Sequence, residues 1–474
     1  MSDPETPNPY GIRFGTDGWR GVIGRDFIFS AVEVVAQAIA DYVRSQPTGS
    51  RQILVGYDTR FMANRFARRV SEVLASNAFD VRLLDRAFPT PYVSFEVKRR
   101  GMAGGVMVTA SHNPPEFCGI KFKAPFGGSA TPELVKQIES QLYRNPVRRT
   151  SSGAEGSVTQ EPPGREYFDA VKSRIDFESV RKARLRVVAD AMHGAAAGLL
   201  ETLLTSEGIS CSSIRQDPDP LFGGLFPEPM EENLLPLRKA VLDRQADIGL
   251  ATDGDADRLG VMDSFGNYVN THQILALLIL HLVRVRGCTG TVVKTFSQSV
   301  LIERICRKLG LSLKVVPIGF KNIADLMLRE DILIGGEESG GVGVRDYIPE
   351  RDGILINLMV LEAVSRRGAG LRQMVEELWE EFGECHFLRK DLHVHLELGR
   401  ELVERLRNCP PSRFAGYPLD RVETLDGTKL VFQDESWILF RQSGTEPVLR
   451  IYSEAPSLAQ VRQLMEEGVR LTQP

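Results

Sequence analysis

The sequence predicts an α/β fold whose pattern can restart in three separate domains, followed by a C-terminal α+β module. Three observations support this. The chain has 474 residues, a length typical of roughly three domains. Apolar strand-like runs alternate with helical patterns through the first three quarters of the chain, which indicates βαβ units with largely parallel pairing. After residue 383 this alternation stops and a different pattern begins.

The alternation is clearest in three stretches, each an expected strand followed by an expected helix. These pairs are 52–58 with 64–78, 185–190 with 195–206, and 290–294 with 299–309; a further strand is expected at 81–84. In the C-terminal module, the period-two run 392–397 predicts a strand and 400–408 predicts a helix, with two more strands and a final helix behind them.

Composition places the domain boundaries. Residues 144–164 are rich in Pro, Ser, Gly and Arg and are interpreted as a linker. A turn at 264–268 and a break at 382–384 mark two further boundaries. The predicted domains are 1–155, 156–265, 266–383 and 384–474.

Bulk properties exclude several classes of function. Apolar residues make up 42% and charged residues 25%, and the net charge is −4, so nothing indicates nucleic-acid binding. The apolar run 274–280 is far too short to cross a membrane, and the polar N-terminus does not resemble a signal peptide. Six cysteines without a Cys-x-x-Cys pair favour reduced thiols and a cytoplasmic protein. Five of them are expected to be packing residues: Cys211, Cys288, Cys306, Cys385 and Cys409.

The first chemical motif presents Ser111 after the apolar strand 105–108 and two small residues. Two prolines follow, which fix φ and prevent a helix from starting there. Ser111 is therefore expected on a stiff loop at the end of a strand, where α/β proteins place their chemistry. With His112 beside it, this serine is a candidate nucleophile or phosphate carrier.

The second motif contains Asp253, Asp255 and Asp257, spaced two residues apart after an apolar run. A tight loop can turn these three carboxylates toward one centre, and such an all-oxygen site suits Mg²⁺. An EF-hand is excluded because its sixth and twelfth positions are Arg258 and Ser264. An acidic turn that caps a helix is the alternative, although three unpaired carboxylates in one turn repel each other.

Three further loops are suited to sugars and anions. The run 334–341 carries two glutamates and Ser339 among glycines, which suits hydroxyl groups, although an ordinary surface loop is equally consistent. The run 440–450 brings arginine, serine, glycine and threonine into a turn, as a phosphate nest would; a solvated turn is the alternative. The run 13–21 places three glycines around Thr16 and Arg20, which suits an anion or a tight turn. Together the motifs favour phosphoryl transfer involving a sugar phosphate in a cleft between domains.

On these motifs and their order, the chain resembles the α-D-phosphohexomutase superfamily, the phosphoglucomutases and phosphomannomutases. The resemblance covers nearly the whole chain. It implies three α/β domains with mixed, largely parallel sheets plus a smaller C-terminal α+β domain, around one central cleft. It also implies an intramolecular phosphotransferase of the isomerase class, acting in carbohydrate metabolism.

The resemblance implies roles for individual residues. Ser111 would carry the phosphoryl group and, with Asp253, Asp255 and Asp257, would contact Mg²⁺. His112, Lys121 and Arg258 would be catalytic, and the general base stays open among Lys121, Lys321 and His112. The implied substrate-binding residues are Arg20, Lys321, Glu337, Ser339, Arg441, Ser443, Gly444, Thr445 and Arg450.

Departures from the family pattern bear on the sugar. Cys118 stands where many relatives have asparagine, which affects a secondary loop contact. Glu338 and Gly341 stand where dual-specificity relatives have methionine and histidine, so this loop resembles the glucose-preferring branch. The run 317–321 resembles the same branch, whereas the glucosamine branch carries glutamine in the sugar loop.

The sequence therefore predicts a phosphoglucomutase that interconverts glucose 1-phosphate and glucose 6-phosphate, with glucose 1,6-bisphosphate as intermediate and activator. Mannose phosphates are further candidate substrates. The alternatives are a phosphomannomutase, a glucose 1,6-bisphosphate synthase, a phosphatase with Asp253 as nucleophile and Asp255 as acid, and a non-catalytic sensor. The expected partner is a hexose phosphate, with no nucleic acid or membrane, and the chain is expected to be a monomer or homodimer.

Overall fold

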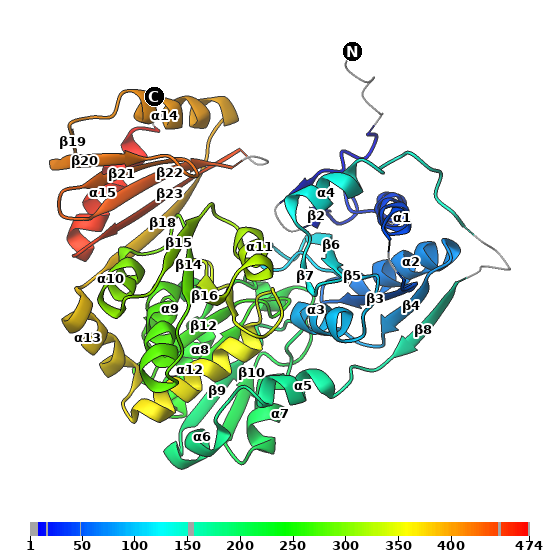
Figure 1. Ribbon diagram of the computed structural model, residues 1–474, viewed down its shortest axis with the longest axis horizontal. Helices are drawn as coiled ribbons and strands as arrows, with labels where there is room; N and C mark the ends of the chain where they lie inside the picture. Colours follow the sequence, from blue (N-terminus) through cyan, green and yellow to red (C-terminus); the bar gives the residue numbers. More distant parts are fainter. Residues whose placement is uncertain (1–7, 16–17, 48, 150–155, 444–446, 473–474) are drawn as a thin grey trace. The chain divides into compact units, whose positions relative to one another are not determined.

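The computed structural model describes residues 8–15, 18–47, 49–149, 156–443 and 447–472. The chain divides into two compact units, and Figure 1 labels their helices and strands. Unit 1 contains Met1–Thr271, Phe320–Gly335 and Ser339–Arg372. Unit 2 contains His272–Gly319, Gly336–Glu338 and Gln373–Pro474.

The first sheet of unit 1 is mixed. Its strand order is β1-β2-β6-β5-β3-β4-β8, with β7 on β6. β3 pairs in parallel with β4 and β5, and β4 with β8, whereas β1, β2, β6 and β7 pair antiparallel. The strands are β1 Phe14–Gly15, β2 Gly18–Val22, β3 Gln52–Tyr57, β4 Asp80–Leu84, β5 Gly104–Val108, β6 Phe117–Ala124, β7 Gly128–Ser129 and β8 Ser157–Glu161.

Strand β8 corrects the predicted linker at 144–164. Its five residues pair with β4 along its whole length. Four of the five are exposed, so the strand has no alternation of apolar and polar residues to reveal it. The linker prediction is wrong for this stretch.

Helices cover both faces of the first sheet: α1 Phe29–Ser45, α2 Ala63–Ser76, α3 Thr90–Arg99 and α4 Pro132–Glu139. Helix α3 approaches β5 closely, since a Cβ on Gly105 would lie 2.8 Å from a methyl of Val97. This packing brings the N-terminal end of α3, Thr90, beside the loop that contains Asp255.

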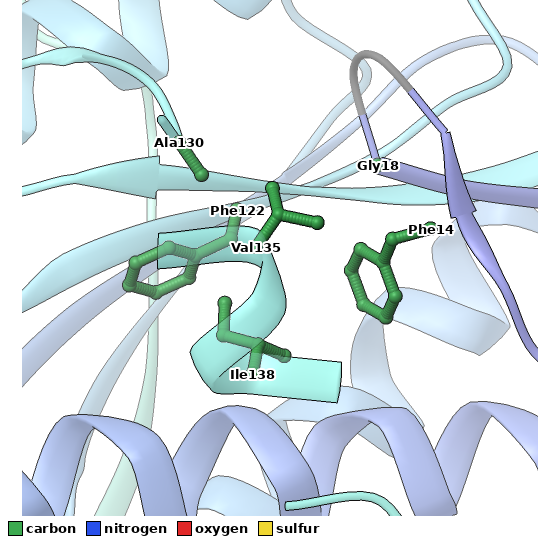
Figure 2. Close-up of a pocket in the computed structure, with 6 residues that line it drawn as sticks. All are labelled: Phe14, Gly18, Phe122, Ala130, Val135 and Ile138. Carbon is green, nitrogen blue, oxygen red and sulfur yellow. The ribbon is translucent and has the colours of Figure 1, made fainter. Parts of the chain in front are cut away.

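Figure 2 shows a small pocket near α4. Its lining is apolar and does not suit a sugar phosphate. The lining residues are Phe14, Gly18, Phe122, Ala130, Val135 and Ile138.

The second sheet of unit 1 has the order β10-β9-β11-β12-β13. β9 pairs in parallel with β10 and β11, and β11 and β12 form an antiparallel hairpin whose connection is the aspartate loop. The strands are β9 Arg186–Asp190, β10 Ser210–Ile214, β11 Ile248–Thr252, β12 Leu259–Asp263 and β13 Tyr268–Val269. The helices are α5 Glu166–Lys172, α6 Phe177–Ala183, α7 Leu199–Ser206 and α8 Leu235–Asp243, with 3₁₀ turns at Phe222–Gly224 and Glu231–Asn233.

Helix α7 starts four residues later than predicted, at Leu199 instead of 195. Gly198 precedes it with φ 68°, a left-handed conformation that is not helical and that glycine adopts without steric cost. The rest of unit 1 contains α11 Phe320–Arg329, most of β16 Ile332–Gly336, β17 Val342–Val344 and α12 Gly353–Arg367.

Unit 2 begins with the long apolar helix α9 Thr271–Leu280, which continues as a π-helical turn, His281–Val285. β14 Thr291–Thr295 and β15 Leu313–Val316 pair in parallel, and α10 Val300–Leu309 lies between them in the sequence. Most of α13 Leu371–Phe382 also belongs to this unit. Among the described helices, none is long and apolar enough to cross a membrane.

The C-terminal part of unit 2 is an antiparallel sheet with helices, so the predicted α+β module is confirmed. The order is β18-β23-β22-β21-β20-β19. The elements are β18 His386–His393, α14 Leu396–Asn408, β19 Arg413–Phe414, β20 Tyr417–Glu423, β21 Thr428–Phe432, β22 Trp437–Gln442, β23 Val448–Ala455 and α15 Leu458–Arg470.

Two predictions for this module are wrong. The strand expected at 392–397 lies mostly earlier and ends at His393, because the apolar residues at 394 and 396 lead into α14. The module has six strands where three were expected, since β19 and β20 are short or half-exposed and lack a clear alternation.

All six cysteines are free thiols, but Cys409 is exposed and is therefore not a packing residue.

Candidate active site

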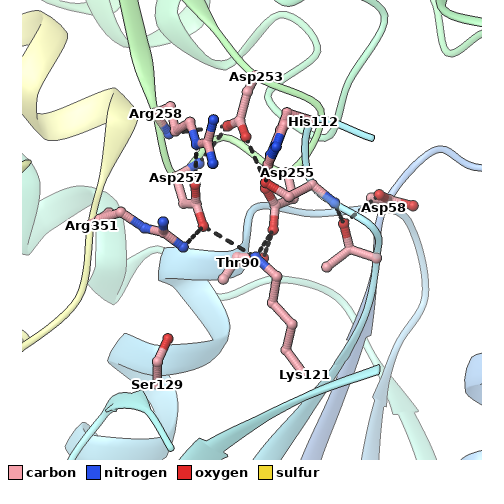
Figure 3. Close-up of polar contacts among 12 residues, drawn as sticks. Asp58, Thr90, His112, Lys121, Ser129, Asp253, Asp255, Asp257, Arg258 and Arg351 are labelled. Carbon is pink, nitrogen blue, oxygen red and sulfur yellow. Dashed lines mark hydrogen bonds and ion pairs between the residues drawn. The ribbon is translucent and has the colours of Figure 1, made fainter. Parts of the chain in front are cut away.

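The aspartate loop is the centre of the site in unit 1. Asp253, Asp255 and Asp257 are fully buried, and one carboxylate oxygen of each lies within 4.8 Å of the other two. Figure 3 shows the three side chains gathered between the ends of several strands and helices. The loop is held from within, since Oδ1 of Asp253 accepts hydrogen bonds from the backbone N–H groups of Asp257 and Arg258 at 2.9 and 3.0 Å.

Cationic and hydroxyl groups surround two of the carboxylates. The Nζ of Lys121 lies 2.9 Å from Oδ2 of Asp255 and 3.2 Å from Oδ2 of Asp257. Arg351 donates to the same oxygen of Asp257 at 2.6 Å, and the Thr90 hydroxyl donates to Oδ2 of Asp255 at 2.6 Å. These contacts bring together segments that are far apart in the sequence (Figure 3).

The aspartates differ in their electrostatic environments. Burial, together with the charges of Asp257 and Asp255, raises the pKa of Asp253 well above its ordinary value. Burial alone would also raise the pKa of Asp255. The charge of Lys121 and the hydrogen bonds from Thr90 and Lys121 outweigh burial there, and the pKa of Asp255 lies below its ordinary value. Three buried carboxylates so close together favour a bound cation.

The oxygens of this loop fit a divalent metal ion. Oδ1 of Asp255 and Oδ1 of Asp257 are buried and have no hydrogen-bond partner among the described residues. Unsatisfied buried carboxylate oxygens are costly, and a hard cation satisfies them. The donor set is all oxygen, as Mg²⁺ prefers. The predicted metal ligands are thus brought together in an arrangement that could hold a metal.

Ser111 lies directly against the aspartate loop. Its Oγ donates to Oδ2 of Asp253 at 3.0 Å, and Nδ1 of His112 lies 3.4 Å from the same Oγ. A Cβ on Gly254 would come within 2.6 Å of the Ser111 carbonyl oxygen, so only glycine allows the two loops to pack this closely. The structure brings together two motifs that lie 142 residues apart.

Other predicted residues of unit 1 surround these loops. Arg20 donates to the side chain of Asn113, two residues after the serine, at 2.5 Å. Arg258 donates to Glu228 at 3.0 Å. The carbonyl of Gly340 accepts from the N–H of Leu259 at 3.1 Å, which places the residue after Ser339 beside the end of the aspartate loop. Lys321 is half-buried in the first turn of α11.

In unit 2, Arg441 and Arg450 are directly opposite each other on β22 and β23. Like charges in such a pair repel, and each guanidinium has an acidic partner: Asp426 lies 2.9 Å from Arg441, and Asp391 lies 3.3 Å from Arg450. Two neighbouring guanidinium groups can also share a phosphate.

Among the described residues, Ser443 and Glu337 lie outside the helices and strands of unit 2. The backbone N–H of Ser443 donates to the carbonyl of Val448 at 2.9 Å. Gly444 and Thr445 lie outside the described residues. In the predicted sugar loop, Glu337 is buried, while Glu338 accepts from the Ser297 hydroxyl at 2.6 Å.

Sequence reasoning missed Thr90 and Arg351. Thr90 follows a proline at the start of α3 and looks like an ordinary helix start. Arg351 belongs to a charged run, Glu350 to Asp352, just before α12. A run of three charged residues between apolar segments was the available signal, but it does not show which partner each residue has.

A serine hydroxyl packed against buried carboxylates on an α/β fold is typical of phosphoryl-transfer enzymes that use a divalent cation. Comparison with known proteins identifies the class more closely. Four family models match in order: Phosphoglucomutase/phosphomannomutase, alpha/beta/alpha domain I at residues 11–148, domain II at 165–266, domain III at 270–382, and the C-terminal domain at 415–471.

The chain belongs to the phosphoglucomutase/phosphomannomutase family of the α-D-phosphohexomutase superfamily. It is 31% identical over 463 residues to the "Phosphoglucomutase/phosphomannomutase" of Thermococcus kodakarensis, covering 97% of this chain and 98% of that protein. It is 32% identical over 461 residues to the "Probable phosphoglucosamine mutase" of Pyrococcus abyssi, covering 97% and 98%. The crystal structure of a "putative phosphomannomutase" from Thermus thermophilus superimposes with a TM-score of 0.87 at 37% identity, covering 98% and 99%.

Members of the superfamily are mutases, so this chain is an intramolecular phosphotransferase of the isomerase class. The predicted fold is confirmed: α/β domains with mixed sheets precede a C-terminal domain with an antiparallel sheet. The names of the relatives mention different sugars, namely glucose, mannose and glucosamine, so they do not specify the hexose phosphate on which this chain acts.

Proposed function

We propose that the protein is a phosphoglucomutase that interconverts glucose 1-phosphate and glucose 6-phosphate through a phosphorylated Ser111. The observation that carries this proposal is the 3.0 Å contact between the Ser111 hydroxyl and Asp253, at a buried cluster of three carboxylates. A serine at this place can exchange a phosphoryl group beside a bound cation.

Asp253, Asp255 and Asp257 would hold Mg²⁺, which when bound neutralises charge on the transferring phosphoryl group. Ser111 would accept the group and return it to the other end of the sugar. Lys121 would orient Asp255 and Asp257 through its two short contacts. Arg258 would stabilise the C-terminal end of the aspartate loop, where its backbone N–H donates to Oδ1 of Asp253.

The substrate's other phosphate would bind Arg441, Ser443, Gly444, Thr445 and Arg450. The facing pair of arginines on β22 and β23 supports this assignment. The sugar hydroxyls would bind Glu337 and Ser339, with Arg20 and Lys321 as additional contacts. Glucose 1,6-bisphosphate would form at the midpoint of each cycle and would activate dephosphorylated enzyme.

The base that removes the proton from the sugar hydroxyl is proposed to be one of His112, Lys121 and Lys321. The Nδ1 of His112 lies 3.4 Å from Oγ of the serine. Lys121 contacts two of the aspartates. Replacing each in turn and comparing the pH dependence of kcat would identify the base.

The glucose preference is proposed from the sugar loop, where Glu338 stands in place of the methionine of dual-specificity relatives. The hydroxyls of Ser297 and Thr295 hold its carboxylate, at 2.6 and 3.3 Å. The test is a side-by-side assay of glucose, mannose and glucosamine 1-phosphates with Mg²⁺. The highest kcat/KM is expected for glucose, and a higher value for mannose or glucosamine 1-phosphate would contradict the preference.

A phosphatase with Asp253 as nucleophile is the second candidate. Both oxygens of Asp253 already accept hydrogen bonds, Oδ1 from two backbone N–H groups and Oδ2 from Ser111, which favours a binding role over attack. Ser111→Ala separates the two. A mutase should lose at least ~10³-fold in kcat, measured as glucose 6-phosphate formed with a trace of glucose 1,6-bisphosphate. Persisting turnover would exclude the mutase.

A glucose 1,6-bisphosphate synthase would phosphorylate a hexose phosphate from a separate donor, whereas a mutase needs only catalytic glucose 1,6-bisphosphate.

The domain bounds at 155, 265 and 383 stay predictions. A cytoplasmic location is proposed from the six free thiols. Whether the protein is a monomer or a homodimer is to be measured by sedimentation.

A further inference from the structure

Arg60 lies directly behind the serine loop and is fully buried. It follows β3, and its guanidinium donates five hydrogen bonds. One goes from Nε to Oδ2 of Asp58 at 3.1 Å. The other four go to backbone carbonyls of the serine loop and its continuation: Ser111 at 2.6 Å, Asn113 at 2.6 Å, Pro114 at 2.7 Å and Phe117 at 2.9 Å.

The same network also holds the N–H of Ser111. The Thr109 hydroxyl accepts from this N–H at 2.8 Å and donates to Oδ2 of Asp58 at 2.6 Å. Both backbone polar groups of Ser111 are therefore fixed by three side chains, those of Asp58, Arg60 and Thr109. We call these three residues the Arg60 clamp.

Ser111 needs such a support because its backbone is strained. Its φ is 53°, in the left-handed region that residues other than glycine rarely adopt. Strained conformations persist when the surrounding structure over-determines them, and they are concentrated at functional sites. Released from the clamp, Ser111 would relax toward an ordinary conformation, and its Oγ would turn away from Asp253.

A further contact fixes the guanidinium itself. The ring of Phe222 lies against it, with 5.0 Å between Cζ of Arg60 and the ring centroid. This aromatic cover limits access of water and favours a planar, delocalised cation. Lysine could not replace arginine here, because one ammonium nitrogen with three donors cannot reach four carbonyls in different directions.

We propose that Arg60 is a positioning residue that holds Ser111 in its left-handed conformation, so that Oγ faces the aspartate loop throughout the phosphoryl exchange. This inference rests on the proposed function. Arg60 binds the serine loop and Asp58, which are distinct from the proposed sugar and phosphate contacts. Its loss should therefore slow phosphoryl transfer and leave substrate affinity nearly unchanged.

The test compares Arg60→Lys with a matched control, Arg215→Lys. Arg215 is also a largely buried arginine of unit 1 that binds an aspartate, with its Nε 2.8 Å from Oδ1 of Asp190, and it donates to the carbonyl of Asn233 at 3.2 Å. Both variants lose a guanidinium fork and are expected to lower Tm. Only Arg60→Lys disturbs the serine loop.

Three quantities are measured: kcat and KM for glucose 1-phosphate, Tm, and the single-turnover rate of Ser111 phosphorylation by glucose 1,6-bisphosphate. Arg60→Lys should lower kcat and the phosphorylation rate by ~100-fold, the effect of a small misplacement of a reacting atom. KM should stay within about threefold, and Arg215→Lys should keep kcat within about threefold of wild type.

The clamp is refuted if wild type is active and the kcat of Arg60→Lys is within about threefold of that of Arg215→Lys. It is also refuted if Arg60→Lys raises KM and leaves the phosphorylation rate unchanged. If Arg60→Lys does not fold, Thr109→Val decides by the same criteria, since it removes the acceptor for the Ser111 N–H and the hydroxyl contact to Asp58 but leaves the Arg60 guanidinium in place. An inactive wild type without phosphoserine refutes the proposed function instead.

Discussion

A buried ion pair in unit 1 joins Lys123 of β6 to Glu350, next to Arg351. The Nζ of Lys123 lies 2.6 Å from Oε2 of Glu350, and both side chains have zero exposure. Ser129 shares the cluster, since its hydroxyl donates to the same carboxylate oxygen at 2.8 Å and accepts from Nζ at 3.0 Å. We predict that Lys123→Met destabilises unit 1 substantially.

The magnitude follows from the geometry. Two unit charges 2.6 Å apart attract by ~6 kcal/mol at an effective dielectric constant of about 20. Burying the ammonium offsets part of this attraction. Removing one partner of a buried pair nevertheless costs ~3–5 kcal/mol, because the other charge is left uncompensated. Both side chains are fully buried, so solvent does not weaken the attraction between them. The double variant Lys123→Met/Glu350→Leu should lose less than Lys123→Met alone, because no orphan charge remains.

The assay is urea denaturation followed by the fluorescence of Trp19, which is buried on β2 beside β6. Trp379 and Trp437 are replaced by phenylalanine in the background protein. Lys239→Met serves as control, since its partner Asp243 and Lys239 itself are exposed, and the expected loss there is below ~0.5 kcal/mol. A cost below ~1 kcal/mol for Lys123→Met, or a larger loss in the double variant than in the single one, would show that Lys123→Met leaves no costly orphan charge on Glu350.

Three further predictions concern the site and unit 2. Arg351→Met should lower kcat by ~10–100-fold with little change in KM, because the 2.6 Å contact that orients Asp257 is lost; an unchanged kcat would contradict this role. Mg²⁺ at about 100 times its Kd should raise the free energy of unfolding by ~2.7 kcal/mol, and Asp255→Asn should reduce this gain in calorimetry; equal gains would exclude the aspartate site. Burial lowers the pKa of Lys429 to about 7, below its value in the unfolded chain. The unfolded chain therefore binds more protons than the folded one between about pH 7 and 10. Over this range the stability of unit 2 should rise with pH, by at most ~1.4 kcal/mol per pH unit. Lys429→Met should remove that contribution, and an identical pH dependence of the two proteins would refute it.

The sequence was sufficient to predict the parts of the site that lie within short motifs. Ser111 follows a strand and precedes two prolines, and the three aspartates occupy one tight loop, so each local conformation is strongly restricted by its own residues. Their meeting at 3.0 Å was expected only because the two motifs together favour one chemistry. Local pattern alone does not specify that contact.

The contacts that sequence reasoning missed depend on long-range packing. Thr90 and Asp255 are 165 positions apart, and Arg351 and Asp257 are 94 apart. Such pairs follow from the packing of α3 and of the segment before α12 against the aspartate loop, which no local periodicity encodes. The same reason applies to β8, whose exposed residues are recognisable as a strand only through their pairing with β4.

Peptide mapping of the phosphorylated protein tests whether Ser111 carries the phosphoryl group. The purified enzyme is incubated with Mg²⁺ and glucose 1,6-bisphosphate, digested and analysed by mass spectrometry, with Ser111→Ala treated in parallel. One acid-stable phosphate is expected on Ser111 in the wild type and none in the variant. A phosphate on Asp253, labile to hydroxylamine and still formed in Ser111→Ala, would contradict it.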